Sequence, residues 1–337
     1  MKVLGIETSC DECSVAVVED GRTILGQVIA TQLEEHAPYR GVVPEIASRT
    51  HTRWIGPVYR RTLERAGVDA RELDAVAVTT RPGLVGSLVV GLSFAKGLAY
   101  GLGLPIVGVD HMLAHLYAPQ LAGEIEYPFL GLLVSGGHTI IARADDPFTM
   151  HVMGTTIDDA CGEAFDKVAK HYDLGYPGGV AIDRLAQRGD DRAFAFPEAN
   201  LHKGEHRYDV SYSGLKTAVI NQLEQFRDGE SPASKENIAA SFQRVAIDSL
   251  VKRLFRAVED TGLRRVVVGG GVAANSYLRS VLEAHDELEV RFPPVELCTD
   301  NGAMVAGLGY HLLRRGDRDG FELDVCSRVR GFRATYP

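Results

Sequence analysis

The chain has 337 residues, which is too many for one ordinary hydrophobic core and about right for two domains. Its composition, 45% hydrophobic and 24% charged, is typical of a globular protein. The formal net charge of −9 argues against broad nonspecific nucleic-acid binding, although it allows a local basic face.

The first part of the chain alternates strand and helix patterns. Residues 3–19 predict a β-hairpin around the polar turn TSCDEC, and residues 23–31 could add a third strand. A helix is expected from Pro44 to Gly67, because these residue types suit its two ends. The pattern continues with a strand at 73–80, a buried helix at 83–103, a strand at 105–110 and the start of a helix at 111–121.

The hairpin layout starts again near residue 128. Residues 128–144 repeat the order of apolar strand, small polar turn and apolar strand. Helical stretches follow at 159–173, 213–226 and 233–260, then a strand, glycine turn and helix at 263–284, and a last helix within 298–316 opened by Thr299 or Asp300. The mixture of strands and helices predicts an α/β fold, and the two hairpin-led halves indicate internal duplication.

The apolar stretch 83–109 is the longest in the chain. Glycines, Lys96 and Pro105 interrupt it, so a buried helix followed by a strand fits it better than a membrane span. No signal peptide is expected, because Glu7 comes before any apolar run could form. The odd number of cysteines, five, favours reduced thiols, and the predicted location is cytoplasmic, with no membrane partner.

Cys10 and Cys13 form a CxxC pair. The sequence has no second pair, so a zinc site made from two of them is not available. We interpret the spacing as coincidence rather than as a redox motif.

Two glycine turns are suited to binding an anion. The turn VSGGHT, 134–139, joins two strands, and VVVGGGVAAN, 266–275, leads from a strand to a helix whose N-terminal N–H groups would face a ligand. Neither turn matches a standard nucleotide fingerprint. Together with the polar hairpin turn near Asp11, they favour a phosphate-binding cleft.

Several carboxylates lie near these turns. Asp159, Glu163 and Asp166 fall on one stripe of a helix, which is either a solvated face balanced by lysines or part of a site. Asp183 follows shortly afterwards, and an acid near a glycine turn could hold a ribose hydroxyl.

The segment HMLAH places His111 and His115 four residues apart, so both imidazoles would face the same way on a helix and could bind one cation. The alternative is two unrelated histidines. Met112 stands where a zinc protease would carry its general-base glutamate, which disfavours proteolysis. A third ligand must come from elsewhere, and Asp300 and Asp11 are the candidates.

These motifs together resemble one family, the bacterial tRNA N6-adenosine threonylcarbamoyltransferases, formerly called glycoproteases. The resemblance runs essentially from end to end. It is carried by GIETSCDE, GVVPEIASR, PGLVGSL, the histidines of HMLAH, LLVSGGHT, DDACGEAFDK, YPGG, YSGLK, GGGVAAN and CTDNGAM.

The resemblance implies an actin-like, sugar-kinase-like (ASKHA) ATPase fold with two duplicated lobes and a nucleotide cleft between them. We expect lobe I at 1–108 plus 305–337, and lobe II, with the metal and nucleotide loops, at 109–304. It also implies transfer of a threonylcarbamoyl group from threonylcarbamoyl-AMP to N6 of the adenosine beside the anticodon of ANN-decoding tRNAs. The expected partners are tRNA, a paralogous subunit and a small ATPase.

Site residues can be carried over by motif, as expectations. His111, His115 and Asp300 correspond to ligands of one divalent metal, with iron favoured by the resemblance and zinc an alternative. Asp11 and Glu12 correspond to active-site acids, either of which could act as the base. The residues expected to contact the donor or an adenine nucleotide are Val134, Ser135, Gly136, Gly137, His138, Asp166, Gly179, Asp183 and Asn275.

The sequence departs from the family pattern at a few positions. Leu113 and Ala114 replace an acid and a glycine inside the histidine motif, and Cys13 replaces a threonine, which creates the CxxC. Arg40 stands where many bacterial members have glycine, and Leu133 where archaeal relatives have a tyrosine ligand. Water, substrate or Asp11 would then complete the metal coordination.

Three other functions compete with this interpretation. A metabolite kinase of the same fold class would use the glycine turns for ATP and need no histidine metal site. A nucleotide-dependent scaffold binding tRNA or protein would tolerate loss of both histidines. A metalloprotease would need the metal but lacks its glutamate.

Overall fold

The first sheet is built on a meander of three strands, β1 (Lys2–Glu7), β2 (Glu12–Glu19) and β3 (Thr23–Thr31). The parallel strands β4 (Ala75–Arg81) and β5 (Ile106–Asp110) extend it beyond β1, giving the order β3-β2-β1-β4-β5. β1, β2 and β4 are buried along almost their whole length, which explains their continuous apolar runs. This computed structural model describes residues 1–199, 201, 206–226, 235–329 and 335–336.

The second sheet repeats this layout. A second meander, β6 (Phe129–Val134), β7 (Thr139–Ala144) and β8 (Met150–Thr155), is extended beyond β6 by the parallel strands β9 (Arg265–Gly269) and β10 (Glu289–Arg291). A short terminal strand, β11 (Thr335–Tyr336), pairs with β8 at the other edge. The internal duplication expected from the two hairpins is therefore confirmed.

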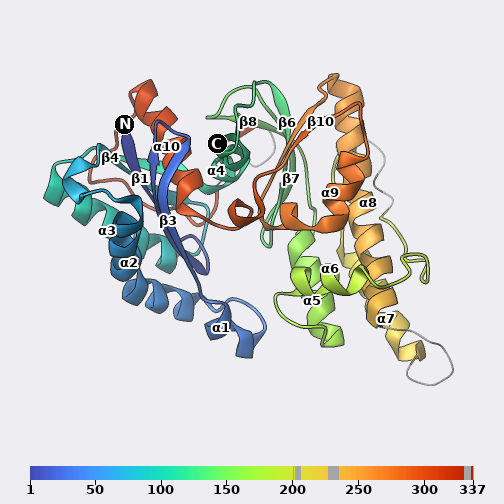
Figure 1. Ribbon diagram of the computed structural model, residues 1–337. Coiled ribbons are helices and arrows are strands. Elements are labelled where there is room, and N and C mark those ends of the chain that lie inside the picture. The colour runs from blue at the N-terminus through green and yellow to red at the C-terminus, as the bar shows by residue number, and fades with distance from the viewer. Residues whose placement is uncertain (200, 202–205, 227–234, 330–334, 337) are drawn as a thin grey trace.

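Helices separate and cover the two sheets in layers (Figure 1). α2 (Pro44–Ala66) and α3 (Val85–Leu102) pack on the outer face of the first sheet. Two helices, α4 (His111–Tyr117) and α10 (Gly302–Arg315), lie between the sheets and share one core with both. The far side of the second sheet is covered by α5 (Cys161–Tyr172), α6 (Gly178–Ala186), α7 (Ser213–Phe226), α8 (Lys235–Thr261) and α9 (Ser276–Glu283). The short α1 (Leu33–His36) follows β3.

Close backbone contact fixes α10 against the first sheet. A Cβ atom on Gly5 would lie 2.1 Å from the carbonyl oxygen of Gly302, so β1 needs glycine at this position. The start of α10 is thus held against β1 and the middle of β2, since Gly302 also approaches the backbone of Val15 and Ala16. This packing brings residues near 300 to the end of β1.

The sequence placed most elements correctly, but it did not predict the strands β8, β10 and β11 or the helices α1 and α6, and two of its expectations about other helices differ from the structure. α3 is only partly buried, since Val85, Val89 and Tyr100 are 50%, 43% and 79% exposed. It is long and apolar enough to cross a bilayer, but its other side packs against the first sheet and α2. The N-cap of α10 is Asn301, whose side chain accepts from the Met304 N–H, and not Thr299 or Asp300. The side chain of Asp300 is directed to the site described next.

Candidate active site

Helix α4 holds the two histidines at the junction of the sheets. It follows β5 directly, and its N-cap Asp110 accepts hydrogen bonds from the N–H groups of Met112 (3.0 Å) and Leu113 (3.2 Å). The rings of His111 and His115 lie 4.5 Å apart and are 8% and 1% exposed by residue. The spacing in HMLAH therefore gives the shared face that the sequence predicted.

Asp300 completes this cluster from the segment before α10. Its Oδ1 lies 2.9 Å from Nε2 of His115 and 3.6 Å from Nε2 of His111. One ligand atom from each of the three residues lies within 4.8 Å of the others. Two imidazoles and a carboxylate make a donor set suited to zinc, iron or manganese.

Glu7 and Ser9 contact the Nδ1 side of the His111 ring, opposite the Nε2 atom that faces Asp300. The fully buried Glu7 places Oε2 3.1 Å from Nδ1 of His111, and the Ser9 hydroxyl lies 3.2 Å from the same nitrogen. Glu7 also accepts from the Ser9 N–H and the Thr79 hydroxyl, both at 2.6 Å. With the proton on Nδ1, Nε2 is left to face Asp300. Sequence reasoning missed Glu7, whose signal is an acid ending an otherwise apolar strand.

The cluster attracts positive charge. Burial opposes protonation of His111, but Asp300 and Glu7 raise its pKa to about 9. Burial opposes ionisation of Asp300 too, yet the histidines hold the pKa of Asp300 well below its usual range. Burial and the two histidines lower the pKa of the neighbouring His138 to about 4, so that ring is neutral. The carboxylates of Asp300 and Glu7, with the converging donor atoms, fit a bound cation.

The turn between β6 and β7 brings His138 to this cluster. Val134 is the last residue of β6, and the Ser135 Oγ accepts from the N–H groups of Gly137 (3.3 Å) and His138 (3.1 Å). Gly136 and Gly137 are exposed at the tip. The turn is thus internally braced, and its tip is open to a ligand.

Asp11 and Glu12 lie where β1 turns into β2. Burial, Asp11 and Asp300 raise the pKa of Glu12 well above its usual range, which shows that the three carboxylates share one region. The Nε2 of His51, on α2, donates to the carbonyl of Cys10 at 2.9 Å and so supports this turn. The structure therefore places Asp11 and Glu12 beside the His–His–Asp cluster.

The remaining predicted residues lie on the second half of the chain. Asp166, on α5, accepts from the N–H of Gly178 at 2.8 Å, at the start of α6, where Gly179 borders open space. Burial raises the pKa of Asp166, and Asp11, on the turn between β1 and β2, contributes to this shift.

Asp183 and Asn275 form a second cluster. The Nδ2 of Asn275 donates to Asp183 (3.3 Å) and to Gln243 (2.8 Å), and Asp183 accepts from the Ser276 hydroxyl at 2.7 Å. Asn275 also caps α9, because its oxygen accepts from the Leu278 N–H. Both side chains are held at the start of α9, just after the glycine turn that follows β9.

The other carboxylates of the expected stripe have structural partners. Asp159 accepts from Lys167 (2.6 Å) and from Lys216 (2.5 Å), and Glu163 pairs with Lys167 at 2.8 Å. Of these three acids, Asp166 is the one that bonds to the start of α6 and whose pKa is raised by Asp11. The lysine-balanced face considered from sequence is therefore correct for the other two acids.

Cys10 and Cys13 do not have the properties of a redox pair. Burial raises the pKa of Cys13 to about 12, and burial together with Asp11 raises that of Cys10 well above its usual range. A redox CxxC requires a lowered thiol pKa. The structure thus supports coincidence.

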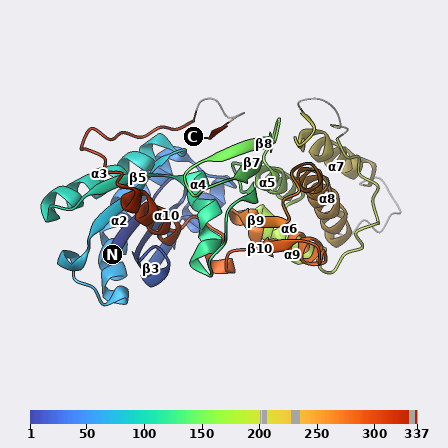
Figure 2. The ribbon, with the colours of Figure 1, turned by 90° about the horizontal axis from the view of Figure 1, so that it is seen from above.

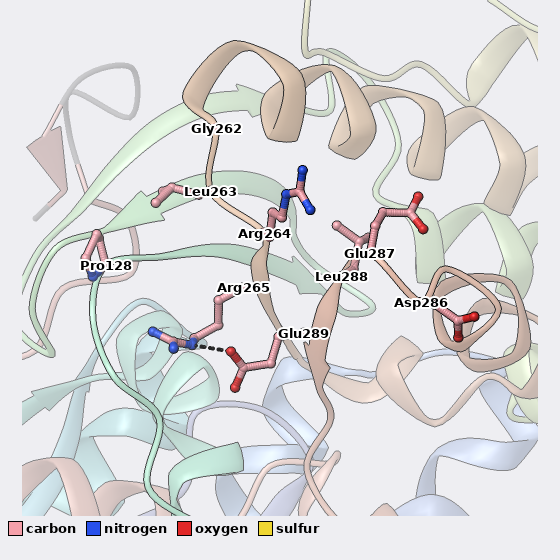
Figure 3. A pocket seen from close by; sticks show the side chains of 9 residues that line it. All are labelled: Pro128, Gly262, Leu263, Arg264, Arg265, Asp286, Glu287, Leu288 and Glu289. Atoms are coloured by element: carbon pink, nitrogen blue, oxygen red, sulfur yellow. Dashed lines mark hydrogen bonds and ion pairs between the residues drawn. The ribbon is translucent and has the colours of Figure 1, made fainter.

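A separate hollow of about 720 Å³ lies at the opposite end of β9 (Figure 3). Its charges largely neutralise one another, since Arg265 pairs with Glu289 at 2.9 Å and with Glu126 at 3.3 Å. The glycine turn and the metal-ligand cluster lie at the carboxyl ends of the central strands, where ligands usually bind in such sheets. The hollow is therefore separate from the candidate active site.

The chain matches a family model described as tRNA N6-adenosine threonylcarbamoyltransferase over residues 23–307. It is 57% identical over 332 residues to a protein of that name from Treponema denticola, covering 98% of each chain. A protein of the same name from Borreliella afzelii is 52% identical over 338 residues, covering 100% of this chain and 96% of the relative.

Solved structures share the fold at low sequence identity. Full-length HypF, in a phosphate- and nucleotide-bound form, aligns with a TM-score of 0.63 at 13% identity, over 93% of this chain and 46% of its own. An ROK hexokinase from Thermus thermophilus aligns with a TM-score of 0.50 at 15% identity, over 94% and 100% of the two chains. The α/β, actin-like and sugar-kinase-like architecture with two lobes is confirmed.

Proposed function

This chain belongs to the tRNA N6-adenosine threonylcarbamoyltransferase family, an acyltransferase family of tRNA modification, and we propose that its His–His–Asp cluster is the metal centre of that reaction. The observation that supports this most is the convergence of His111, His115 and Asp300 on one point, beside the turn that carries His138. Family membership does not favour the kinase, scaffold or protease alternatives.

The residues fit a divalent cation. His111 and His115 would bind it through Nε2 and Asp300 through Oδ1, with iron proposed from the family resemblance and zinc as the alternative. When bound, the metal would supply Lewis-acid polarisation of an acyl-donor oxygen. Glu7 holds the Nδ1 proton of His111 and keeps Nε2 directed at the site.

We propose threonylcarbamoyl-AMP as the donor, bound across the cleft between the lobes. The tip of the β6–β7 turn, Val134 to His138, would hold the threonylcarbamoyl or phosphate end. Asp166, Gly179, Asp183 and Asn275 would contact the adenylate, and the open space at Gly179 and the carboxylate of Asp183 at the start of α9 support this. The chain's task is then mainly to position an already activated acyl group.

The acids of the first turn are proposed to handle the proton of the adenosine amine. Burial, Asp11 and Asp300 raise the pKa of Glu12, and a carboxylate with a raised pKa is a stronger base in its ionised form, so we assign proton removal to Glu12. Asp11, which contributes to that shift, would tune Glu12 and balance charge. The target base would be unstacked and presented from the anticodon loop.

A basic face on α2 is the proposed tRNA contact. Arg49, Arg53, Arg60, Arg61 and Arg65 are all exposed along this helix, which also supports the Asp11 turn through His51. We propose cytoplasmic action with a paralogous subunit and a small ATPase. The proposed lobes are 1–108 plus 305–337 and 109–304.

The test uses purified protein of known metal content with tRNA, threonine, bicarbonate, ATP, the donor-forming enzyme and the partner subunits. Digested tRNA is then analysed by mass spectrometry for threonylcarbamoyl-adenosine. We expect a product peak that is lost in His111→Ala and kept in His285→Ala, a control at a histidine that is half-exposed beside Glu287. Full activity of His111→Ala would refute the metal centre.

A further inference from the structure

Asp110, the N-cap residue of α4, accepts hydrogen bonds on both of its carboxylate oxygens. Oδ1 of Asp110 accepts the N–H groups of Met112 and Leu113 and so sets the first turn of the helix. Oδ2 accepts from the hydroxyl of Tyr336 at 2.7 Å and from Nε of Arg81 at 3.2 Å. His111 is the next residue after Asp110 and the first residue of the turn that this carboxylate caps, so the cap and a proposed metal ligand belong to the same helical turn.

Tyr336 reaches Asp110 from the far end of the chain. The segment after α10 first runs along the first sheet, where Asp319 bonds to the Ile106 carbonyl and to the Gly108 N–H. The terminal strand β11 then pairs with β8 of the second sheet, with Tyr336 opposite Met150. Figure 2 shows the C-terminal end beside β8, close to α4.

The tyrosine is built into the core between the sheets. Tyr336 is 1% exposed and belongs to the same apolar cluster as Met112 of α4. The side chain of Arg81, by contrast, is 43% exposed, so it constrains Oδ2 less than the buried phenol does. Of the two donors to Oδ2, the hydroxyl is the one with a fixed direction.

We propose that Tyr336 is a positioning residue for the metal centre. Its hydroxyl fixes the Asp110 carboxylate, which sets the first turn of α4 and holds Nδ1 of His111 at 3.1 Å from Glu7 and Nε2 toward Asp300. The inference rests on the proposed metal centre and assigns a role to the C-terminus in assembling it.

The test measures Co²⁺ binding to the full-length protein by chelator competition and by the visible spectrum of the bound ion. Tyr336→Phe removes only the hydroxyl and should raise the Kd for Co²⁺ by about tenfold, the lower end of the range for residues that support metal ligands. The control Tyr172→Phe removes another buried hydroxyl, which donates to the Val219 carbonyl, and should leave the Kd and spectrum unchanged. Equal Kd values and spectra for wild type and Tyr336→Phe would overturn the proposal.

A double-mutant cycle tests the route of the effect. If Tyr336 acts through Asp110, the double variant Tyr336→Phe/Asp110→Asn should bind Co²⁺ no more weakly than Asp110→Asn alone. Additive losses would show a different route and contradict the proposal. His111→Ala is the reference: Co²⁺ affinity unchanged by this substitution would refute the metal centre itself, whereas a loss there with no effect of Tyr336→Phe refutes only the positioning role.

Discussion

Replacing Glu7 by glutamine should weaken metal binding while leaving the fold intact. The two carboxylate oxygens of Glu7 accept from three donors: the Ser9 N–H, the Thr79 hydroxyl and, in the proposed tautomer, Nδ1–H of His111. A glutamine has one acceptor oxygen and one NH₂ group. At least one of the three hydrogen-bond donors would therefore meet the NH₂ group, which is itself a donor. The imidazole can relieve the conflict by moving its proton to Nε2, the atom proposed to bind the metal.

The size of the effect follows from this conflict. Loss of a carboxylate that supports a ligand histidine typically costs about 10–100-fold in metal affinity, or about 1.4–2.7 kcal/mol. Glu7 is fully buried, and solvent cannot compensate for the missing acceptor. We therefore expect the upper half of this range for Glu7→Gln.

The assay is Zn²⁺ competition with a chromophoric chelator, together with thermal unfolding of the metal-free protein. Asp209→Asn is a matched control, because Asp209 is 1% exposed, accepts from the Thr155 N–H and lies 2.8 Å from Nδ1 of His206. Both variants should lose stability, but only Glu7→Gln should lose Zn²⁺ affinity. A Zn²⁺ Kd within twofold of wild type for Glu7→Gln would refute the reasoning.

Three further predictions concern other parts of the site. Glu12→Gln should lower kcat for threonylcarbamoyl-adenosine formation by about 10²–10⁴-fold with little change in the KM for tRNA, and an unchanged kcat would exclude Glu12 as the base. At pH 8 iodoacetamide should label the exposed Cys326 and spare Cys13, whose pKa of about 12 keeps the thiol protonated; comparable labelling of both, read by peptide mass spectrometry, would contradict the burial of Cys13 in β2. Gly269→Ala should lower the free energy of unfolding in urea by about 1–3 kcal/mol, because its Cβ would lie 2.4 Å from a carbonyl oxygen of α4, whereas Gly271→Ala, with open space around it, should not.

Local signals were sufficient for much of the fold. Pro44 and Gly67 marked α2 to within one residue, and the two strand–turn–strand patterns gave the hairpins β1–β2 and β6–β7, but not the third strand of the second meander, β8. The four-residue spacing of His111 and His115 gave their shared face because α4 is a regular helix. These features depend on neighbours within a few positions.

Contacts between distant segments could not be predicted in the same way. Lys216 pairs with Asp159 from 57 residues away, and Glu7 meets His111 across 104 residues. The hydroxyl of Tyr336 reaches Asp110 across 226 residues. The sequence near each residue does not indicate a partner so far along the chain. The residues that support the site can therefore be identified only from the packing of the two sheets.

The position of α10 has a consequence for the order in which the protein is made. The inner face of the first sheet, with Val3, Ala16 and Ala77, is covered by a helix that ends at Arg315. A ribosome that has finished β5 at Asp110 must add about 200 more residues before this helix exists, which takes roughly 10–40 s at typical rates. During that interval the nascent first half carries an uncovered apolar face, and holding it soluble falls to chaperones or to the ribosome surface.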